Sequence, residues 1–294
     1  MDFRKITIED KEWIKDRLAV DQFYGAEYCF STMFNWQDFY HNEIAKFEGF
    51  AVIRSRFEGV TFGYFGAGDR LKLIQALEEE AAKEGVPLRL HSILEPERQR
   101  LEEQMPGKFL FEEDRVDFDY CYSREKLAEL KGRKLAAKRN HIKHFLVSCP
   151  DWSYEPITEK NLPECRAMSV DWYKNREETT GEKLEEEQKA LYTAMDHFKE
   201  EELMGGLLRV GEKVEAFTLA SAVNKDTVVV HFEKANLTYP GCYPMINQQF
   251  VEKSCQNYSR INREDDMGSE SLRKAKESYV PDEMLVKYDA TLAR

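Results

Sequence analysis

The chain has 294 residues, which is long enough for two domains of ordinary size or one large domain. Hydrophobic residues make up 42% of it, with 18 Phe and 14 Tyr, so it can build real cores and is not a disordered chain. Its formal net charge of −12 excludes a protein that coats nucleic acid with its whole surface, although a local basic patch is compatible with this charge.

The first half of the chain alternates between strand-like and helix-like segments. Apolar residues at every second position predict strands, and apolar residues three and four positions apart predict helices. The segment 71–84 carries Leu73, Ile74 and Leu77 on one face and ends before Gly85, as helices commonly do. In order, the expected elements are a helix over 8–20, strands over 49–53 and 60–65, a helix over 71–84, a strand over 87–93, a helix over 95–104 and two strands within 109–122.

One long helix is expected over residues 123–147, and it holds the most concentrated positive charge of the chain. Between Lys131 and His144 the sequence has six Lys or Arg, two His and no acid. One interpretation is an exposed basic face balanced by acidic neighbours. The other is a surface that binds the phosphate groups of a nucleic acid or a coenzyme. The candidate phosphate-binding residues are Arg133, Lys134, Lys138, Arg139 and Lys143.

A break at residues 149–151 (Cys-Pro-Asp) precedes a second half that is predicted to repeat the architecture of the first. The expected elements are a strand over 152–157, a helix over 158–174, a solvated connection over 176–187, a helix over 187–199, a three-strand meander over 205–231, a helix over 245–258, a strand over 259–262, a helix over 271–278 and a closing strand over 283–290. The expected domains are therefore residues 1–150 and 151–294, with the candidate active site in the second.

The loop NREDDMG at residues 262–268 places charged side chains between a predicted strand and a helix that Ser269 can cap. Such a loop is a common place for a reaction or anion site. The alternative is a solvated acidic turn that only caps the helix. Glu264 and Asp265 are candidate catalytic residues, because neighbouring carboxylates push the pKa of one of them upward and so favour acid–base chemistry.

Two further catalytic candidates lie on the last strand of the meander. His231 and Glu233 are two residues apart and therefore face the same side of a strand, whereas Lys234 faces the other. The alternative for His231 is an ordinary hydrogen-bonded histidine of a sheet.

Residues that could bind a substrate or a donor surround these positions. Arg263, Arg273 or Lys276 could stabilise an oxyanion or bind phosphates. Asn247 and Gln248 could orient a carbonyl, or they could be ordinary capping and surface residues. The complete set of candidate substrate- and donor-binding residues is Lys234, Asn247, Gln248, Asn262, Arg263, Arg273, Lys276 and Tyr279.

The six cysteines are scattered, without a Cys-x-x-Cys pair or metal-ligand spacing. This pattern favours reduced thiols in a cytoplasmic protein and predicts no metal site. The charged N-terminus lacks the apolar core of a signal peptide, and no run approaches the roughly 18 to 20 apolar residues of a membrane span. We therefore expect a cytoplasmic chain without a transmembrane segment and with no certain cofactor.

Several stretches carry a family resemblance. They are GRKLAAKRNHIKHF at 132–145, VVVHFEKAN at 228–236, Tyr243 followed by NQQF at 247–250, NREDDMG at 262–268 and LRKAKESYVP at 272–281. Together they resemble the bacterial family that shares the C-terminal domain of phosphatidylglycerol lysyltransferase. The resemblance implies an α/β (α+β) fold of two tandem GNAT-like modules, each with a mixed, mainly antiparallel sheet flanked by helices. It also implies a relation to Fem-type transferases, which move an aminoacyl group from a charged tRNA to an amine or a hydroxyl.

The function that this resemblance implies is acyl or aminoacyl transfer. The co-substrate would be an aminoacyl-tRNA or an acyl-CoA, and the acceptor a small molecule, a peptide or a lipid headgroup. Between residues 237 and 243 only Gly241 stands where a CoA-binding GNAT module has a glycine-rich loop that cradles pyrophosphate, which disfavours acetyl-CoA. The alternatives are a non-catalytic ligand-binding protein of the same fold and a small-metabolite N-acetyltransferase.

Overall fold

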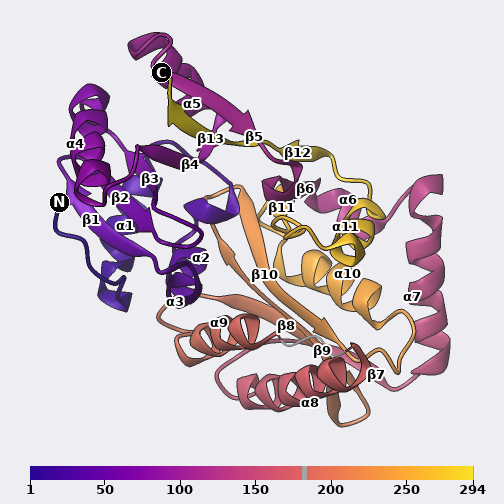
Figure 1. Cartoon of the computed structure of the whole chain (residues 1–294). Helices are drawn as coiled ribbons and strands as arrows, with labels where there is room; N and C mark the ends of the chain where they lie inside the picture. Colours follow the sequence, from indigo (N-terminus) through magenta and orange to yellow (C-terminus); the bar gives the residue numbers. More distant parts are fainter. Residues whose placement is uncertain (181–183, 294) are drawn as a thin grey trace. The chain divides into compact units, whose positions relative to one another are not determined.

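The computed structural model describes residues 1–180 and 184–293, and in it the chain forms two compact units (Figure 1). Unit 1 contains Met1–Asp119, Asp265–Gly268 and the chain from Met284 onward. Unit 2 contains Tyr120–Glu264 and Ser269–Glu283. Among the described residues, no helix is long and apolar enough to span a membrane.

Unit 1 is built on a six-stranded sheet with the strand order β1-β2-β3-β4-β13-β5. Its strands are β1 (Glu43–Phe47), β2 (Phe50–Ser55), β3 (Thr61–Gly66), β4 (Arg89–Leu94), β5 (Phe109–Glu113) and β13 (Lys287–Leu292). Its helices are α1 (Lys11–Leu18), α2 (Phe30–Asn35), α3 (Gln37–Tyr40), α4 (Arg70–Lys83) and α5 (Glu95–Gln104), with short 3₁₀ helices at Ile8–Asp10, Ala26–Tyr28 and Arg115–Asp117. Among the described strands of this sheet, β3 and β4 pair in parallel and the other neighbours pair antiparallel, so the sheet is mixed and mainly antiparallel.

The expected helix over 71–84 shows how local sequence and core agree in unit 1. Asp69 caps the helix by accepting a hydrogen bond from the backbone N–H of Lys72 at 3.2 Å. Leu73, Ile74 and Leu77 are fully buried in the core of this unit. The apolar face predicted by the helical period is therefore the face that packs.

Unit 2 is built on a seven-stranded sheet with the strand order β12-β6-β11-β10-β9-β8-β7. Its strands are β6 (Asp119–Ser123), β7 (Trp152–Pro156), β8 (Met204–Val210), β9 (Lys213–Ala222), β10 (Thr227–Ala235), β11 (Arg260–Asn262) and β12 (Glu283–Leu285). Its helices are α6 (Arg124–Glu129), α7 (Ala136–Ser148), α8 (Leu162–Thr180), α9 (Glu185–Asp196), α10 (Cys242–Ser254) and α11 (Glu270–Glu277), with a 3₁₀ helix at Arg133–Leu135. The predicted fold class, two modules with mixed sheets flanked by helices, is confirmed.

Helices cover both faces of the sheet in unit 2. The side chain of Glu233 on β10 accepts a hydrogen bond from Asn247 of α10. The next side chain, Lys234, points to the opposite face, where its ammonium lies 4.0 Å from the centre of the Trp172 ring of α8. Figure 1 shows α10 and α8 at the two faces of β10. The predicted alternation of Glu233 and Lys234 is therefore confirmed.

The compact units differ from the expected domains of residues 1–150 and 151–294. Strand β6 and helices α6 and α7, which were expected in the first half, belong to unit 2. Strand β13, which was expected in the second half, pairs with β4 and β5 of unit 1. Each sheet therefore contains strands that are distant in the sequence, and strand partners of this kind cannot be read from local periodicity.

The single helix predicted over 123–147 is wrong, because the chain breaks it into α6, a 3₁₀ turn and α7. Leu130 is fully buried in a left-handed conformation that ends α6, and Gly132 follows with a φ of +89°. The guanidinium of Arg139 donates hydrogen bonds to the carbonyl oxygens of Leu130 and Gly132, the latter at 2.8 Å. These bonds stabilise the break that the helical period did not reveal.

Two other predicted boundaries also differ from the structure. The closing strand over 283–290 is two strands, β12 and β13, which belong to different sheets. The expected connection over 176–187 falls partly on residues 181–183, which lie outside the described residues, while α8 continues to Thr180 and α9 already begins at Glu185.

Candidate functional site

The candidate site lies in unit 2, where two parallel strands separate. Strands β10 and β11 pair over only three residues, the last pair being Val229 with Asn262. Beyond this pair, β10 continues to Ala235, and its register with β9 is irregular between Val230 and Phe232. The carboxyl ends of diverging parallel strands are a common place for ligands in sheets of this kind.

After Asn262 the backbone follows β6 instead of β10. The N–H of Arg263 donates to the carbonyl oxygen of Tyr120 at 3.0 Å, and the N–H of Tyr120 donates to the carbonyl oxygen of Glu264 at 3.1 Å. Side chains bridge β10 and this segment. The crossing pairs are His231 with Glu264 and Glu233 with Arg263.

The first crossing pair belongs to a chain of hydrogen bonds through His231. Its Nδ1 lies 2.9 Å from Oε1 of Glu264, and its Nε2 lies 2.7 Å from the hydroxyl of Ser221 on β9. A neutral imidazole satisfies both contacts by donating from Nδ1 to the carboxylate and accepting from the hydroxyl. The His231 side chain is only 3% exposed, whereas that of Glu264 is 21% exposed. Glu264 is therefore the end of this chain of hydrogen bonds that is more open to solvent.

The second crossing pair is a buried ion pair. Oε1 of Glu233 accepts a hydrogen bond from Nη2 of Arg263 at 3.0 Å, and Oε2 accepts one from Asn247 at 3.1 Å. The hydroxyl of Thr218 on β9 lies at 3.5 Å from the same Oε2. The side chains of Glu233 and Arg263 are 9% and 11% exposed. Removing charges from water is costly, so a buried pair like this one is often retained for a purpose other than stability.

An aromatic ring brings two cations of this site together. The guanidinium carbon of Arg263 lies 4.9 Å from the centre of the Tyr279 ring, and the ammonium of Lys138 from α7 lies 4.0 Å from the same centre. Burial and the positive charge of Arg263 lower the pKa of Lys138 to about 8, while Glu233 opposes this shift. Burial also raises the pKa of Tyr279 above its usual value, so its hydroxyl stays neutral.

The loop 262–268 is held by its own side chains. Three of them accept hydrogen bonds from a backbone N–H two residues further on, as Asn and Asp commonly do in turns. The pairs are Asn262 with Glu264 (2.7 Å), Asp265 with Met267 (2.8 Å) and Asp266 with Gly268 (3.0 Å). Glu264 has a φ of +59°, which is uncommon for a residue with a side chain and is found at functional sites.

The two neighbouring acids of this loop have different surroundings. Glu264 contacts His231 in unit 2. The carboxylate of Asp265 instead gathers with those of Glu27 and Asp119 in unit 1. The sequence predicted that the adjacent carboxylates of Glu264 and Asp265 raise the pKa of one of them. In the structure each carboxylate instead has its own set of partners.

Several predicted binding residues have structural contacts. The ammonium of Lys276 donates to the carbonyl oxygens of Arg263 and Glu264 at 2.7 and 3.3 Å, so it holds the loop. Gln248 donates to the carbonyl oxygen of Ala128 at 2.9 Å and thereby ties α10 to α6. Lys234 binds Glu187 on the face of the sheet that α8 and α9 cover.

The remaining predicted binding residues are Arg273 and the basic residues of the segment 131–144. Arg273 is half-buried on α11, within the amphipathic helix that Ser269 caps as expected. Among the basic residues of the segment 131–144, Arg133, Lys134 and Lys143 are exposed, while Arg139 is used to hold the break before α7. Of the five predicted phosphate-binding residues, only Lys138 reaches Tyr279.

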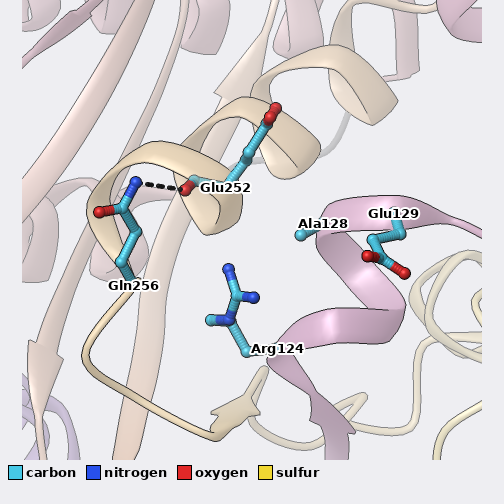
Figure 2. Close-up of a pocket in the computed structure, with 5 residues that line it drawn as sticks. All are labelled: Arg124, Ala128, Glu129, Glu252 and Gln256. Carbon is cyan, nitrogen blue, oxygen red and sulfur yellow. Dashed lines mark hydrogen bonds between the residues drawn. The ribbon is translucent and has the colours of Figure 1, made fainter.

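A separate pocket opens between α6 and α10, with a volume of about 400 Å³ (Figure 2). It is lined by Arg124, Ala128, Glu129, Glu252 and Gln256. In Figure 2 the Arg124 side chain points into the space between the two helices. None of the residues predicted from the sequence lines this pocket, so it is distinct from the site between β10 and β11.

Unit 1 contains a charged cluster of its own. The carboxylate oxygens of Glu27, Asp119 and Asp265 lie within 4.8 Å of one another, which is close enough for a metal site. The ammonium of Lys287, however, already binds Asp119 at 2.7 Å and Glu27 at 2.5 Å. Asp119 and Lys287 are almost completely buried. The structure thus places a cation of the chain itself among these acids, and we assign no metal there.

This cluster predicts a dependence of stability on pH. Burial, reinforced by the charge of Asp119, raises the pKa of Glu27 from 4.5 to about 7, against the opposing effect of Lys287. Between these values the folded chain binds more protons than the unfolded chain, so stability falls as the pH rises. We expect Glu27→Gln to flatten this fall in urea unfolding measured across pH 4.5 to 7. The exposed Glu79→Gln is the matched control, and a fall of equal size in Glu27→Gln would contradict the assignment.

Sequence reasoning did not identify Ser221 and Thr218, although both contact predicted catalytic residues. Both lie on β9, where each is flanked by apolar residues and resembles an ordinary strand residue. Their pairing with β10 is the signal that could have found them, because it sets Thr218 directly opposite Glu233.

The chain is similar to known proteins in sequence family and in fold. A family model described as "Phosphatidylglycerol lysyltransferase, C-terminal" matches residues 19–291. A crystal structure of a conserved protein of unknown function from Bacteroides thetaiotaomicron is 36% identical, covers all of both chains and superposes with a TM-score of 0.92. These matches confirm the predicted family resemblance.

More distant relatives share the fold. The structure of L-PGS from Bacillus licheniformis is 13% identical, covers 96% of this chain and 90% of its own, and has a TM-score of 0.65. That of FemX is 9% identical, covers 98% and 97% and has a TM-score of 0.61. An uncharacterized protein of Mycoplasmoides gallisepticum is 24% identical over 176 residues, which are 58% of this chain and 54% of that protein, so the match spans about half of its length.

Proposed function

Because the chain belongs to the family of phosphatidylglycerol lysyltransferase C-terminal domains, we propose that it transfers an aminoacyl group from an aminoacyl-tRNA to an amine or hydroxyl acceptor. The observation that carries the proposal is the pair of side-chain bridges between β10 and the segment after β11, His231 with Glu264 and Glu233 with Arg263. They hold the carboxylate of Glu264 and the guanidinium of Arg263 at the same gap. The acceptor is a small molecule, a peptide or a lipid headgroup, and a transfer assay with one of each class distinguishes them.

In this proposal, Glu264 is the general base of the reaction. Its carboxylate would take the proton of the acceptor amine or hydroxyl as that group attacks the ester carbonyl of the donor. The tetrahedral intermediate then expels the 3′ oxygen of the tRNA, which receives the proton back from Glu264. His231 would orient the carboxylate through its 2.9 Å hydrogen bond and is itself held by Ser221. Both act as positioning residues in this scheme.

The surroundings of α10 favour an aminoacyl-tRNA over a CoA ester as the donor. Gly241 precedes this helix with a φ of +88°, and a Cβ atom at this position would lie only 2.1 Å from the carbonyl oxygen of His141. The loop before α10 is thus packed closely on α7, at the place where a CoA-binding relative would cradle pyrophosphate. The exposed cations Arg133, Lys134 and Lys143 instead offer phosphate contacts to a nucleic acid.

Binding of tRNA tests the proposal directly. We expect a triple substitution of Arg133, Lys134 and Lys143 by glutamate to weaken binding of aminoacyl-tRNA by roughly a hundredfold at low salt, because reversing these charges removes phosphate contacts. Affinity is measured by fluorescence anisotropy at two salt concentrations. These three residues are chosen because they are exposed. Arg139 is exposed too, but it is left unchanged because it bonds to the main chain.

A matched triple variant controls for net charge. Lys174, Lys199 and Lys225 are exposed in the same unit, and the ion pairs that they make with acids among residues 1–180 and 184–293 are long surface contacts of 3.9 to 4.0 Å. Their substitution by glutamate changes the net charge equally and should leave tRNA binding nearly unchanged. Equal loss in both triples would contradict a specific tRNA surface.

Thermal stabilisation by acetyl-CoA without tRNA binding would favour an N-acetyltransferase, and ligand binding without transfer would favour a non-catalytic protein.

A further inference from the structure

A positively charged subsite lies beside the proposed base. Lys138 and Arg263 approach the same ring, that of Tyr279, at 4.0 and 4.9 Å from its centre. Glu233 is the one carboxylate bound to either cation in the described part of the chain, and it binds Arg263. Two cations therefore share a single counter-charge in a place that is largely closed to water.

Two observations indicate that, within the described chain, these cations lack partners that an anion could supply. Nη1 of Arg263 is buried and has no hydrogen-bond partner among the described residues. A buried donor of this kind is costly and therefore requires an explanation. Within the described ranges 1–180 and 184–293, the ammonium of Lys138 makes no ion pair with an acid, and its observed neighbour is the face of Tyr279. An anionic group that contacts both cations would pair with the Arg263 donor and give Lys138 a counter-charge.

The place of Lys138 in the sequence suggests which anion this is. It belongs to the basic segment 131–144, whose members Arg133, Lys134 and Lys143 are exposed. Lys138 is half-buried and points to Tyr279. Lys138 thus connects the exposed positive charge of this segment with Arg263, the residue that precedes Glu264 and contacts the same ring.

We propose that Lys138 and Arg263 bind the phosphate that precedes the terminal adenosine of the donor tRNA. This inference rests on the proposed function and deepens it, because it specifies how the ester would be placed beside Glu264. A guanidinium donates hydrogen bonds to phosphate oxygens in a fixed geometry, and an ammonium supplies a point charge. Both contacts would be strengthened by the exclusion of water at this subsite.

The test measures binding of adenosine 5′-monophosphate, with adenosine as the probe that lacks the phosphate. We expect the protein to bind the monophosphate about tenfold more tightly than adenosine, since charge-assisted bonds are the strong ones. Lys138→Met, which keeps an apolar contact with Tyr279, should remove this difference. Lys174→Met on α8 is the matched control and should retain the difference, because Lys174 is exposed and belongs to no proposed binding surface. Equal affinities for the two probes in the parent protein, or equal loss in both variants, would overturn the proposal.

A second variant separates charge from folding. Lys138→Arg should retain the preference for the monophosphate, and its affinity should stay constant where that of the parent protein falls as the pH rises through about 8. The charged and titratable groups around Lys138 are Arg263, Glu233 and Tyr279, and Lys138→Arg leaves all three unchanged. A parallel fall in both proteins would overturn the role of Lys138.

Two further measurements distinguish a phosphate of the donor from one of the acceptor, and failure of the subsite from failure of the proposed function. If glycerol 3-phosphate binds more tightly than adenosine 5′-monophosphate and is lost in Lys138→Met, the phosphate belongs to an acceptor and the assignment to the donor is overturned. Phosphate-dependent binding without any aminoacyl transfer would support the subsite and count against the proposed function. Aminoacyl transfer without phosphate-dependent binding would support the proposed function and count against the subsite.

Discussion

Glu264→Gln is expected to slow aminoacyl transfer by roughly a hundredfold to ten-thousandfold, while binding of the donor stays close to that of the parent protein. Glutamine keeps the size of the side chain and can still form a hydrogen bond with His231, but it cannot accept the proton of the acceptor. Single-turnover transfer with a saturating donor isolates the chemical step from binding and release. A rate close to that of the parent protein would show that Glu264 is not the base.

The matched control for this prediction is Glu270→Gln. Glu270 begins α11 a few residues later, and its side chain is 79% exposed in a surface pair with Lys274. This substitution should leave the transfer rate unchanged, because a surface pair of this kind contributes little. Melting temperatures of both variants show whether a slower rate reflects chemistry or unfolding. A loss in Glu264→Gln that is accompanied by weaker donor binding of the same size would favour a role in binding.

The fold could be predicted from the sequence where a single period governs a segment. The apolar faces of α4 and of β10 are examples, since Leu73 and Val228 are both completely buried as expected. The prediction failed where a distant contact decides the conformation. The break between α6 and α7 depends on a buried Leu130 with a left-handed backbone. The separation of β12 from β13 places Lys287 beside Asp119, which lies 168 residues earlier.

The candidate site could be predicted in part for the same reason. Residue types near strand ends indicated His231, Glu233 and Arg263, and the structure brings these together as two bridges across one gap. Which residues contact each other could not be predicted. Glu264 and Asp265 are adjacent in the sequence, and yet their partners belong to different units.

Lys287→Met is expected to destabilise the protein by about 3 to 5 kcal/mol, as the removal of one partner from a buried ion pair commonly does. The ammonium binds Asp119 and Glu27, and the charges of these acids raise the pKa of Lys287 well above its usual value despite burial. Without it, Asp119 retains the N–H of Ala26 at 2.8 Å but loses its counter-charge in a position that is 0% exposed. Urea unfolding at neutral pH measures the change.

The control and the pH series make this prediction specific. Lys5→Met removes an exposed lysine of unit 1 whose partner Asp38 is equally exposed, so its effect should stay within about 0.5 kcal/mol. The loss in Lys287→Met should shrink as the pH falls through about 7 and Glu27 takes up a proton, because a neutral carboxyl no longer needs the ammonium. If the loss is small at neutral pH, or if it is the same at all pH values, then Lys287 does not act as the counter-charge of this cluster. The carboxylates would then be stabilised by other groups of unit 1.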